Sequence, residues 1–158
     1  MEKVKILFTK RSKNIYVLQL DNEEILNVDQ EVYFKNYVYE KEDLSYEEID
    51  KLRFQSEKEA CHKRALAYLL NGKRTANRMR SYLFDKGFSE RAVNATIEKL
   101  VEYRKIDDEE FIKSFLKNRI KDHSKNKLIS KLIYHGIDTN MAIEAVEKAL
   151  SEYEEDNY

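Results

Sequence analysis

The sequence predicts a mainly α-helical protein in which two tandem three-helix, helix-turn-helix-like repeats follow a small N-terminal β-rich leader, an α+β arrangement overall. The 158 residues contain three glycines and no proline, so the residues that punctuate all-β folds are scarce. Strand-like runs are confined to the start of the chain, and residues 66–97 match residues 115–146 at a constant offset of 49. The expected organisation is a leader at 1–44, a connecting helix at 45–55, a first repeat at 56–104, a second repeat at 105–151 and an acidic tail at 152–158.

Three short runs in the leader combine β-branched and aromatic residues with polar ones, as half-buried strands do. They are Lys3–Lys10, Asn14–Leu20 and Glu24–Val28. The residues between the first two are few enough for a hairpin loop, so a three-stranded meander is expected. Residues 29–44 leave two alternatives open, a short helix capped by Asp29 and a further strand, because both patterns fit.

Two capping-box patterns follow the leader. Ser45 precedes Glu48 by three residues, and Ser56 precedes Glu59 by three. They predict one helix over about 46–54 and a second over 57–71. Cys61 lies on the apolar face of the second helix, so we interpret it as a small core residue.

The repeat aligns the start and stop signals of helices as well as core positions. Thr75 is an N-cap candidate, Gly87 suits the left-handed residue after a helix, and Phe88 can fold back on that helix. The equivalent residues 49 positions later are Ser124, Gly136 and Ile137. A third helix in each repeat, capped by Ser89 or Asp138, is expected to bury Val93, Ile97, Leu100 and Val101 in the first copy and Ala142, Ala145, Val146 and Ala149 in the second.

The acidic run between the repeats suggests metal binding or acid–base catalysis, but a helix start explains it better. Asp107 and Glu110 have the cap-to-N3 spacing, and negative charge at Asp108 opposes the helix dipole. The three histidines, His62, His123 and His135, lack metal-ligand spacing. We therefore expect no catalytic, cofactor or metal site, and a binding protein that is not an enzyme.

Charge is distributed unevenly along the chain. Residues 60–136 carry 18 basic and 9 acidic residues, between two acidic ends. This favours an acidic protein or a phosphate backbone as partner, although solvated helix faces explain it equally well. The candidate contact residues cluster where each repeat's second helix begins: Lys73, Arg74, Arg78, Arg80, Arg119, Lys121, Lys125, Lys127 and Lys131.

Three motifs together resemble the RecX family of regulatory proteins. They are Ala65–Leu70 with Arg74-Thr75, Lys86-Gly87-Phe88 with its counterpart Gly136-Ile137, and Ile106-Asp107-Asp108 followed by Phe111, Phe115 and Arg119. The resemblance covers about residues 60–150 and departs from the family pattern at Arg78, Arg104-Lys105 and Ile112. In that family Gly87, Phe88, Asp107, Asp108, Phe111, Phe115 and Gly136 would be structural residues.

The resemblance implies a short divergent regulator that binds the RecA recombinase filament on DNA and inhibits it in homologous recombination, DNA repair and the SOS response. Non-specific contact with single- or double-stranded DNA could accompany filament binding. The chain has no apolar run long enough to cross a membrane and no signal peptide, so we expect a cytoplasmic protein. We also expect it to be a monomer.

Two other functions stay open. The first is sequence-independent nucleic-acid binding by a helical repeat. The second is a protein adaptor that uses the leader aromatics Tyr33, Phe34, Tyr37 and Tyr39. The acidic tail, expected to be frayed, could shield the basic middle in any of these cases.

Overall fold

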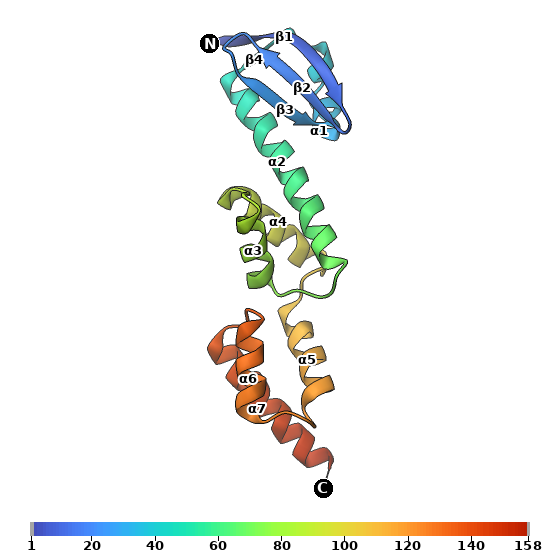
Figure 1. Cartoon of the computed structure of the whole chain (residues 1–158), viewed down its shortest axis with the longest axis vertical. Coiled ribbons are helices and arrows are strands. Elements are labelled where there is room, and N and C mark those ends of the chain that lie inside the picture. Colours follow the sequence, from blue (N-terminus) through green and yellow to red (C-terminus); the bar gives the residue numbers. More distant parts are fainter. Residues whose placement is uncertain (1, 158) are drawn as a thin grey trace. The chain divides into compact units, whose positions relative to one another are not determined.

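The computed structural model describes residues 2–157, and Met1 and Tyr158 lie outside the described part (Figure 1). The chain divides into two compact units, residues 1–64 and residues 65–158. The first unit contains a four-stranded sheet and the second is helical, so the protein is mainly α with an N-terminal β part, as predicted. No described helix is long and apolar enough to span a bilayer.

The sheet of the first unit is antiparallel throughout, with strand order β3-β2-β1-β4. Its strands are β1 (Lys3–Ser12), β2 (Ile15–Leu20), β3 (Ile25–Asp29) and β4 (Asp43–Ser45). The three predicted strands are therefore confirmed, and the hairpin turns at Lys13, whose φ is 55°. Strand β4 was missed because three residues are too few to show an alternating pattern, although it pairs with Lys3–Lys5.

Between β3 and β4 the helical alternative is correct. Helix α1 (Gln30–Lys35) is capped by Asp29, whose carboxylate accepts hydrogen bonds from the backbone N–H groups of Glu31 and Val32 at 3.0 and 3.4 Å. A single 3-10 turn, η1 (Val38–Glu40), follows. A side-chain cap within hydrogen-bond reach of the first turn is what favours helix over strand here.

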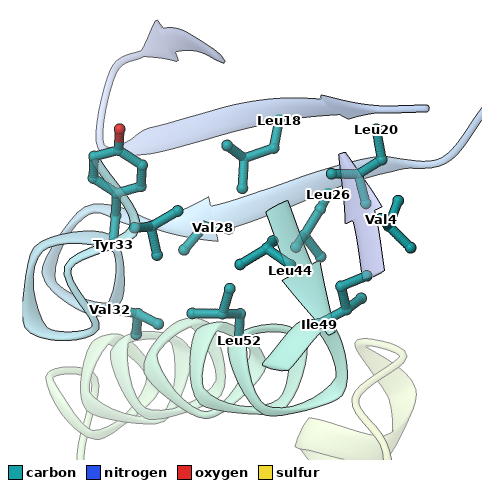
Figure 2. Packing of buried hydrophobic residues seen from close by; sticks show 11 residues of the cluster. Val4, Leu18, Leu20, Leu26, Val28, Val32, Tyr33, Leu44, Ile49 and Leu52 are labelled. Atoms are coloured by element: carbon teal, nitrogen blue, oxygen red, sulfur yellow. The ribbon is translucent and has the colours of Figure 1, made fainter. Parts of the chain in front are cut away.

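The core of the first unit lies between the sheet and the first half of helix α2 (Tyr46–Leu69). Figure 2 shows Leu18, Leu26 and Val28 from the strands directed toward Ile49 and Leu52 of the helix, and all five are at most 3% exposed. Most of the expected adaptor aromatics are at the edge of this core. Of these, Tyr33 is buried and stacks on Tyr16 at 3.9 Å between ring centroids, whereas Phe34, Tyr37 and Tyr39 are about half exposed.

Helix α2 begins at the predicted capping box but does not break where a second one was expected. The Ser45 hydroxyl accepts the Glu48 N–H at 3.1 Å, and the Glu48 carboxylate accepts the Ser45 N–H at 3.2 Å. At Ser56 the prediction of a new helix start is wrong. The chain there has no helix-breaking residue, and the Ser56 hydroxyl instead accepts the backbone N–H of Asp29 at 3.0 Å. Residues 46–54 and 57–69 are therefore parts of one helix.

The second unit contains the last turns of α2 and five further helices. They are α3 (Ala76–Asp85), α4 (Glu90–Glu102), α5 (Asp108–Arg119), α6 (Lys125–Tyr134) and α7 (Thr139–Asp156). The predicted caps are confirmed, because the side chains of Thr75, Ser89, Asp107, Ser124 and Asp138 each accept a first-turn backbone N–H of their helix.

Both predicted glycine stops are also confirmed. Gly87 and Gly136 have φ of 90° and 97°, and each donates its N–H to the carbonyl three residues earlier at 2.9 Å. The N–H of Phe88 reaches the Leu83 carbonyl at 3.3 Å, and the N–H of Ile137 reaches the Leu132 carbonyl at 3.0 Å. These bonds form a Schellman motif at the end of α3 and another at the end of α6.

Two further expectations for the helical unit are wrong. Val101 is 49% exposed, because the buried stripe of α4 runs through Val93, Ile97 and Leu100 and the next residue is turned about 100° away from it. The tail was expected to fray after residue 151, but α7 continues to Asp156 because no residue there interrupts the helix. Ala142 and Val146 are buried as predicted, and Ala145 and Ala149 pack against the same core.

The reciprocal cap of α2 gives the first testable prediction. Replacing Ser45 by alanine leaves the Glu48 N–H without its acceptor and should lower the free energy of unfolding by about 1 kcal/mol. Ser81→Ala, at an exposed position within α3, should change it by less than about 0.5 kcal/mol. Urea denaturation followed by circular dichroism measures both. Equal effects of the two changes would contradict the role of the cap.

Candidate partner-binding surface at the repeat junction

The nine candidate basic residues all lie in the unit of residues 65–158, in two groups. Lys73, Arg74, Arg78 and Arg80 surround the start of α3. Lys121, Lys125, Lys127 and Lys131 surround the start of α6, and Arg119 lies in the last turn of α5. The two groups lie at equivalent junctions of the repeat, where only Arg78 and Lys127 occupy matching positions, and the structure gives them different surroundings.

Side chains at the start of α3 form hydrogen bonds with the end of α6. The Thr75 hydroxyl donates to the His135 carbonyl at 2.5 Å, and the Asn77 amide donates to the Gly136 carbonyl at 2.8 Å. The last carbonyls of a helix have no partners within it and form its negative pole, so they attract such donors. Figure 1 shows the start of α3 facing the end of α6 within this unit. Thr75 is consequently 1% exposed.

Arg78 completes this contact. Its guanidinium donates to the Tyr134 carbonyl at 2.5 Å and lies 4.7 Å from the centre of the Tyr134 ring. The position therefore combines a charge-assisted hydrogen bond with a cation–π contact. A residue chosen from sequence as a partner contact thus joins the two repeats, and the departure from the family pattern at this position has a structural role.

The acidic run before α5 also contributes to the junction. Asp107 caps its own helix through the Glu110 N–H at 3.1 Å, as predicted. Asp108 does more than oppose the helix dipole, because its carboxylate accepts the N–H of Ala76, the first residue of α3, at 2.9 Å. Each repeat therefore supplies a group that satisfies an unpaired helix end of the other.

A groove of about 320 Å³ lies beside this junction. One face of α5 forms its floor, and the rest is lined by Lys73 and His135. The lining residues from α5 are Phe111, Ser114, Phe115, Asn118 and Arg119. The Arg119 guanidinium lies 4.2 Å from the centre of the Phe115 ring, and the Lys73 ammonium lies 3.5 Å from the Ser114 hydroxyl.

The groove combines an aromatic floor with a basic rim. The His135 ring lies 5.4 Å from Phe111 and 5.6 Å from Phe115, measured between ring centroids. Among the described residues no carboxylate lines the groove. A site of this kind suits an acidic side chain that is carried next to an apolar one.

Burial lowers the pKa of the His135 imidazole below its ordinary value of 6.5, and the positive charges of Arg78, Arg119, Arg74 and Lys131 lower it further. These four cations therefore act together on the His135 ring, which lines the groove. His135 was expected to have a plain surface or partly buried role, and the partly buried position is confirmed.

Most of the second group of basic residues is open to solvent, but Lys131 is half-buried and its ammonium lies 3.1 Å from His123 Nε2. Lys121 and Lys127 are exposed and, within residues 2–157, their side chains form no hydrogen bond or ion pair. Lys125 pairs with Glu147 at 3.0 Å. In the first group, by contrast, Arg74 stacks over Tyr68 at 4.2 Å and Arg78 is bonded to α6. Within the described residues, Lys121 and Lys127 at the start of α6 are therefore free, and so is the half-buried Arg80 of α3.

One carboxylate cluster in residues 2–157 could hold a metal ion, namely Asp29, Glu31 and Glu59 in the first unit. Asp29 already caps α1 and pairs with Lys63 at 3.4 Å. Its charge therefore has structural partners, and nothing else at the cluster points to a metal.

Sequence reasoning missed Asn77 and Tyr134 as junction residues. Their partners are more than fifty positions away in the chain, so no local pattern reveals the contact. A signal existed for Asn77, because the repeat places an asparagine at the same position of both copies, Asn77 and Asn126. Nothing comparable marks Tyr134, which is matched by Asp85.

Comparison with known proteins gives a consistent result. No protein-family model matches the chain. A protein named Regulatory protein RecX from Clostridium perfringens strain SM101 is 26% identical over 149 residues, which cover 94% of this chain and 69% of that protein. The protein of the same name from Clostridium botulinum strain Alaska E43 is 24% identical over 153 residues, which cover 97% of this chain and 72% of that protein.

A solved structure has the same fold. A crystal structure of regulatory protein RecX matches 95% of this chain and 74% of its own chain with a TM-score of 0.66, at 20% sequence identity. The similarity extends over the sheet and the helices, since nearly the whole chain is covered.

The two glycine stops form a matched pair for testing the junction. A Cβ added at Gly136 would lie 2.9 Å from the Thr75 hydroxyl oxygen and 3.3 Å from the Arg78 backbone nitrogen, whereas one at Gly87 would meet nothing within 4 Å. Both Gly→Ala changes should cost about 1 kcal/mol from the positive φ. Gly136→Ala should cost a further 1–3 kcal/mol, roughly, from crowding. Equal losses in urea denaturation would contradict the packed junction.

The lowered pKa of His135 predicts a dependence of stability on pH. The unfolded imidazole takes up a proton near pH 6.5 and the folded one only at lower pH, so the contribution of this group is full above that value and is lost as the pH falls below it. His135→Gln keeps the backbone carbonyl that Thr75 uses. The unfolding temperature should therefore fall less in this variant than in the parent protein between about pH 7.5 and 5.5. Thermal melts in the two buffers measure the difference, and identical pH profiles would refute it.

Proposed function

This chain is a divergent member of the RecX family of regulatory proteins, and we propose that it regulates the RecA recombinase by binding the recombinase filament on DNA and reducing its activity. A regulatory role follows from the family. The target, the binding to a filament and the inhibition belong to the proposal. The chain would act by binding alone, in the cytoplasm, without chemistry of its own.

The observation that carries the proposal is the groove of Lys73, Phe111, Ser114, Phe115, Asn118, Arg119 and His135. Two exposed or half-buried cations border an aromatic floor, so an acidic residue with an apolar neighbour can bury its apolar part while its charge is paired. A protein surface offers that combination more readily than a bare phosphate backbone does.

Direct binding of nucleic acid is the second candidate, and the open group of lysines at α6 favours it. Lys121 and Lys127 can contact phosphates without reading sequence. Sequence-specific reading by α3 as a recognition helix is disfavoured, because its first turn is held against α6 and Thr75 is buried. Contact with DNA through the start of α6 can accompany filament binding through the groove.

The test is ATP hydrolysis by RecA on single-stranded DNA while this protein is titrated in below stoichiometric amounts. We expect hydrolysis to be suppressed. Lys73→Glu, which reverses a charge at the rim of the groove, should raise the concentration needed for half suppression by about tenfold. Lys113→Glu is the matched control, because this exposed residue lies on the face of α5 opposite the groove, and it should leave suppression unchanged.

Binding to bare single-stranded DNA over a salt series separates the two candidates. No effect on hydrolysis, together with tight and steeply salt-dependent DNA binding, would overturn filament regulation in favour of the second candidate. In that case Lys121→Glu should reduce the slope of the logarithm of the DNA-binding constant against the logarithm of the salt concentration by roughly one. Lys73→Glu should not affect DNA binding more than the Lys113 control does.

A further inference from the structure

We propose that the helical unit carries a second, open copy of its own junction, through which two molecules of this chain associate head to tail. Side chains from the first turn of α6 in one molecule would donate hydrogen bonds to carbonyls at the end of α3 in another. This inference is independent of the recombinase and of DNA, and it goes beyond the monomer expected from the sequence.

The contact inside the chain provides the template. Thr75, Asn77 and Arg78 supply a hydroxyl, an amide and a cation from the first turn of α3. These groups donate to three consecutive carbonyls at the glycine-terminated end of α6, those of Tyr134, His135 and Gly136. The interface therefore needs three donors at fixed positions of one helix start and a Schellman end opposite them.

The same three kinds of donor recur at the start of α6. At the offset of 49 residues, Thr75 corresponds to Ser124, Asn77 to Asn126 and Arg78 to Lys127. Ser124 caps its helix as Thr75 does, by accepting the Lys127 N–H at 3.3 Å. All three side chains are exposed, whereas Thr75 is buried.

The complementary end of α3 is open as well. Gly87 closes α3 with the same Schellman bonds and a positive φ, yet no atom of the described residues beyond its chain neighbours lies within 4 Å of the place where a Cβ would be. At Gly136 that place is crowded by Thr75, Asn77 and Arg78. Gly87 therefore has the backbone conformation of Gly136, but no other helix start packs against it within the described residues.

The substitutions between the two copies preserve the attraction. Tyr134 corresponds to Asp85 and Arg78 to Lys127, so the cation–π contact of the internal junction would become an ion pair between molecules. Asp85 is exposed. Lys86 lies over the Tyr82 ring of its own helix at 5.5 Å, which draws its charge toward α3. Lys125 is paired with Glu147, so within residues 2–157 Lys127 is the free cation of the first turn of α6.

These features favour a second copy of this chain over a phosphate group as the occupant. A phosphate would satisfy Ser124 and Lys127, but it gives no use to Asp85 or to the open Schellman end. Two different surfaces meet in such a contact, so the association is heterologous and does not stop at a symmetric dimer. Its products would be short chains of molecules whose size grows with concentration.

Sedimentation velocity over a concentration series tests the proposal with the whole chain and no other component. The parent protein should show a weight-average mass that rises with concentration. Asp85→Lys places two cations at the contact, and Lys127→Asp places two carboxylates there, so each variant alone should associate roughly tenfold more weakly. Both positions are exposed, and circular dichroism verifies that the variants fold.

Mixing the two variants is the decisive step. Each variant repels its own kind, but Lys127 of the first meets Asp85 of the second, and the new Asp and Lys residues also attract each other. An equimolar mixture should therefore recover the association of the parent protein. Lys113→Asp is the matched charge-reversal control and should associate as the parent does.

Three results would overturn the proposal. They are a mass that stays at one chain at every concentration, an association that both charge reversals leave unchanged, and a mixture that associates no better than its separate components. Asn126→Ala provides an independent measurement, because it removes a donor without changing charge and should weaken association severalfold.

Discussion

The helical unit depends on hydrogen bonds between side chains at the start of α3 and the otherwise unpaired carbonyls at the end of α6. A helix end leaves carbonyls without partners, and here Thr75, Asn77 and Arg78 from another repeat satisfy three of them. Asp108 satisfies an N–H of α3 in return. Because the bonds join residues about 30 to 60 positions apart, they hold together two sets of helices that are distant in the sequence.

The same contact between the repeats shapes the groove. His135 forms part of its wall because its backbone is held by Thr75, and the ring then rests between Phe111 and Phe115. The same positioning brings arginines near an imidazole that is already partly buried, which keeps the ring neutral near pH 7. Structural and binding roles are therefore not separate here, since the residues that fix the repeats also shape the surface that a partner would meet.

The parts of the fold that local patterns determine were predictable from the sequence. Caps such as Ser45 and Thr75 and stops such as Gly87 act within a few residues, so their patterns are visible in the chain. Ser56 shows the limit of this approach. The same four-residue pattern can sit inside a continuing helix, and a distant backbone N–H then takes the hydroxyl. The sequence indicated that basic residues gather at the helix starts, but only the tertiary structure distinguishes Arg78, which is used internally, from Lys127, which is free.

The matched ends of the repeat bear on how a protein of this kind can change in length. Each three-helix repeat starts its second helix with three donors and ends that helix with a glycine stop. The surface that one repeat offers at its second helix therefore fits what the next repeat presents. Gene duplication or deletion of one whole 49-residue segment would thus bring together ends that already match. Selection could then alter the number of repeats without having to create a new interface each time. The two exposed helix ends, at the end of α3 and the start of α6, would be free to diverge.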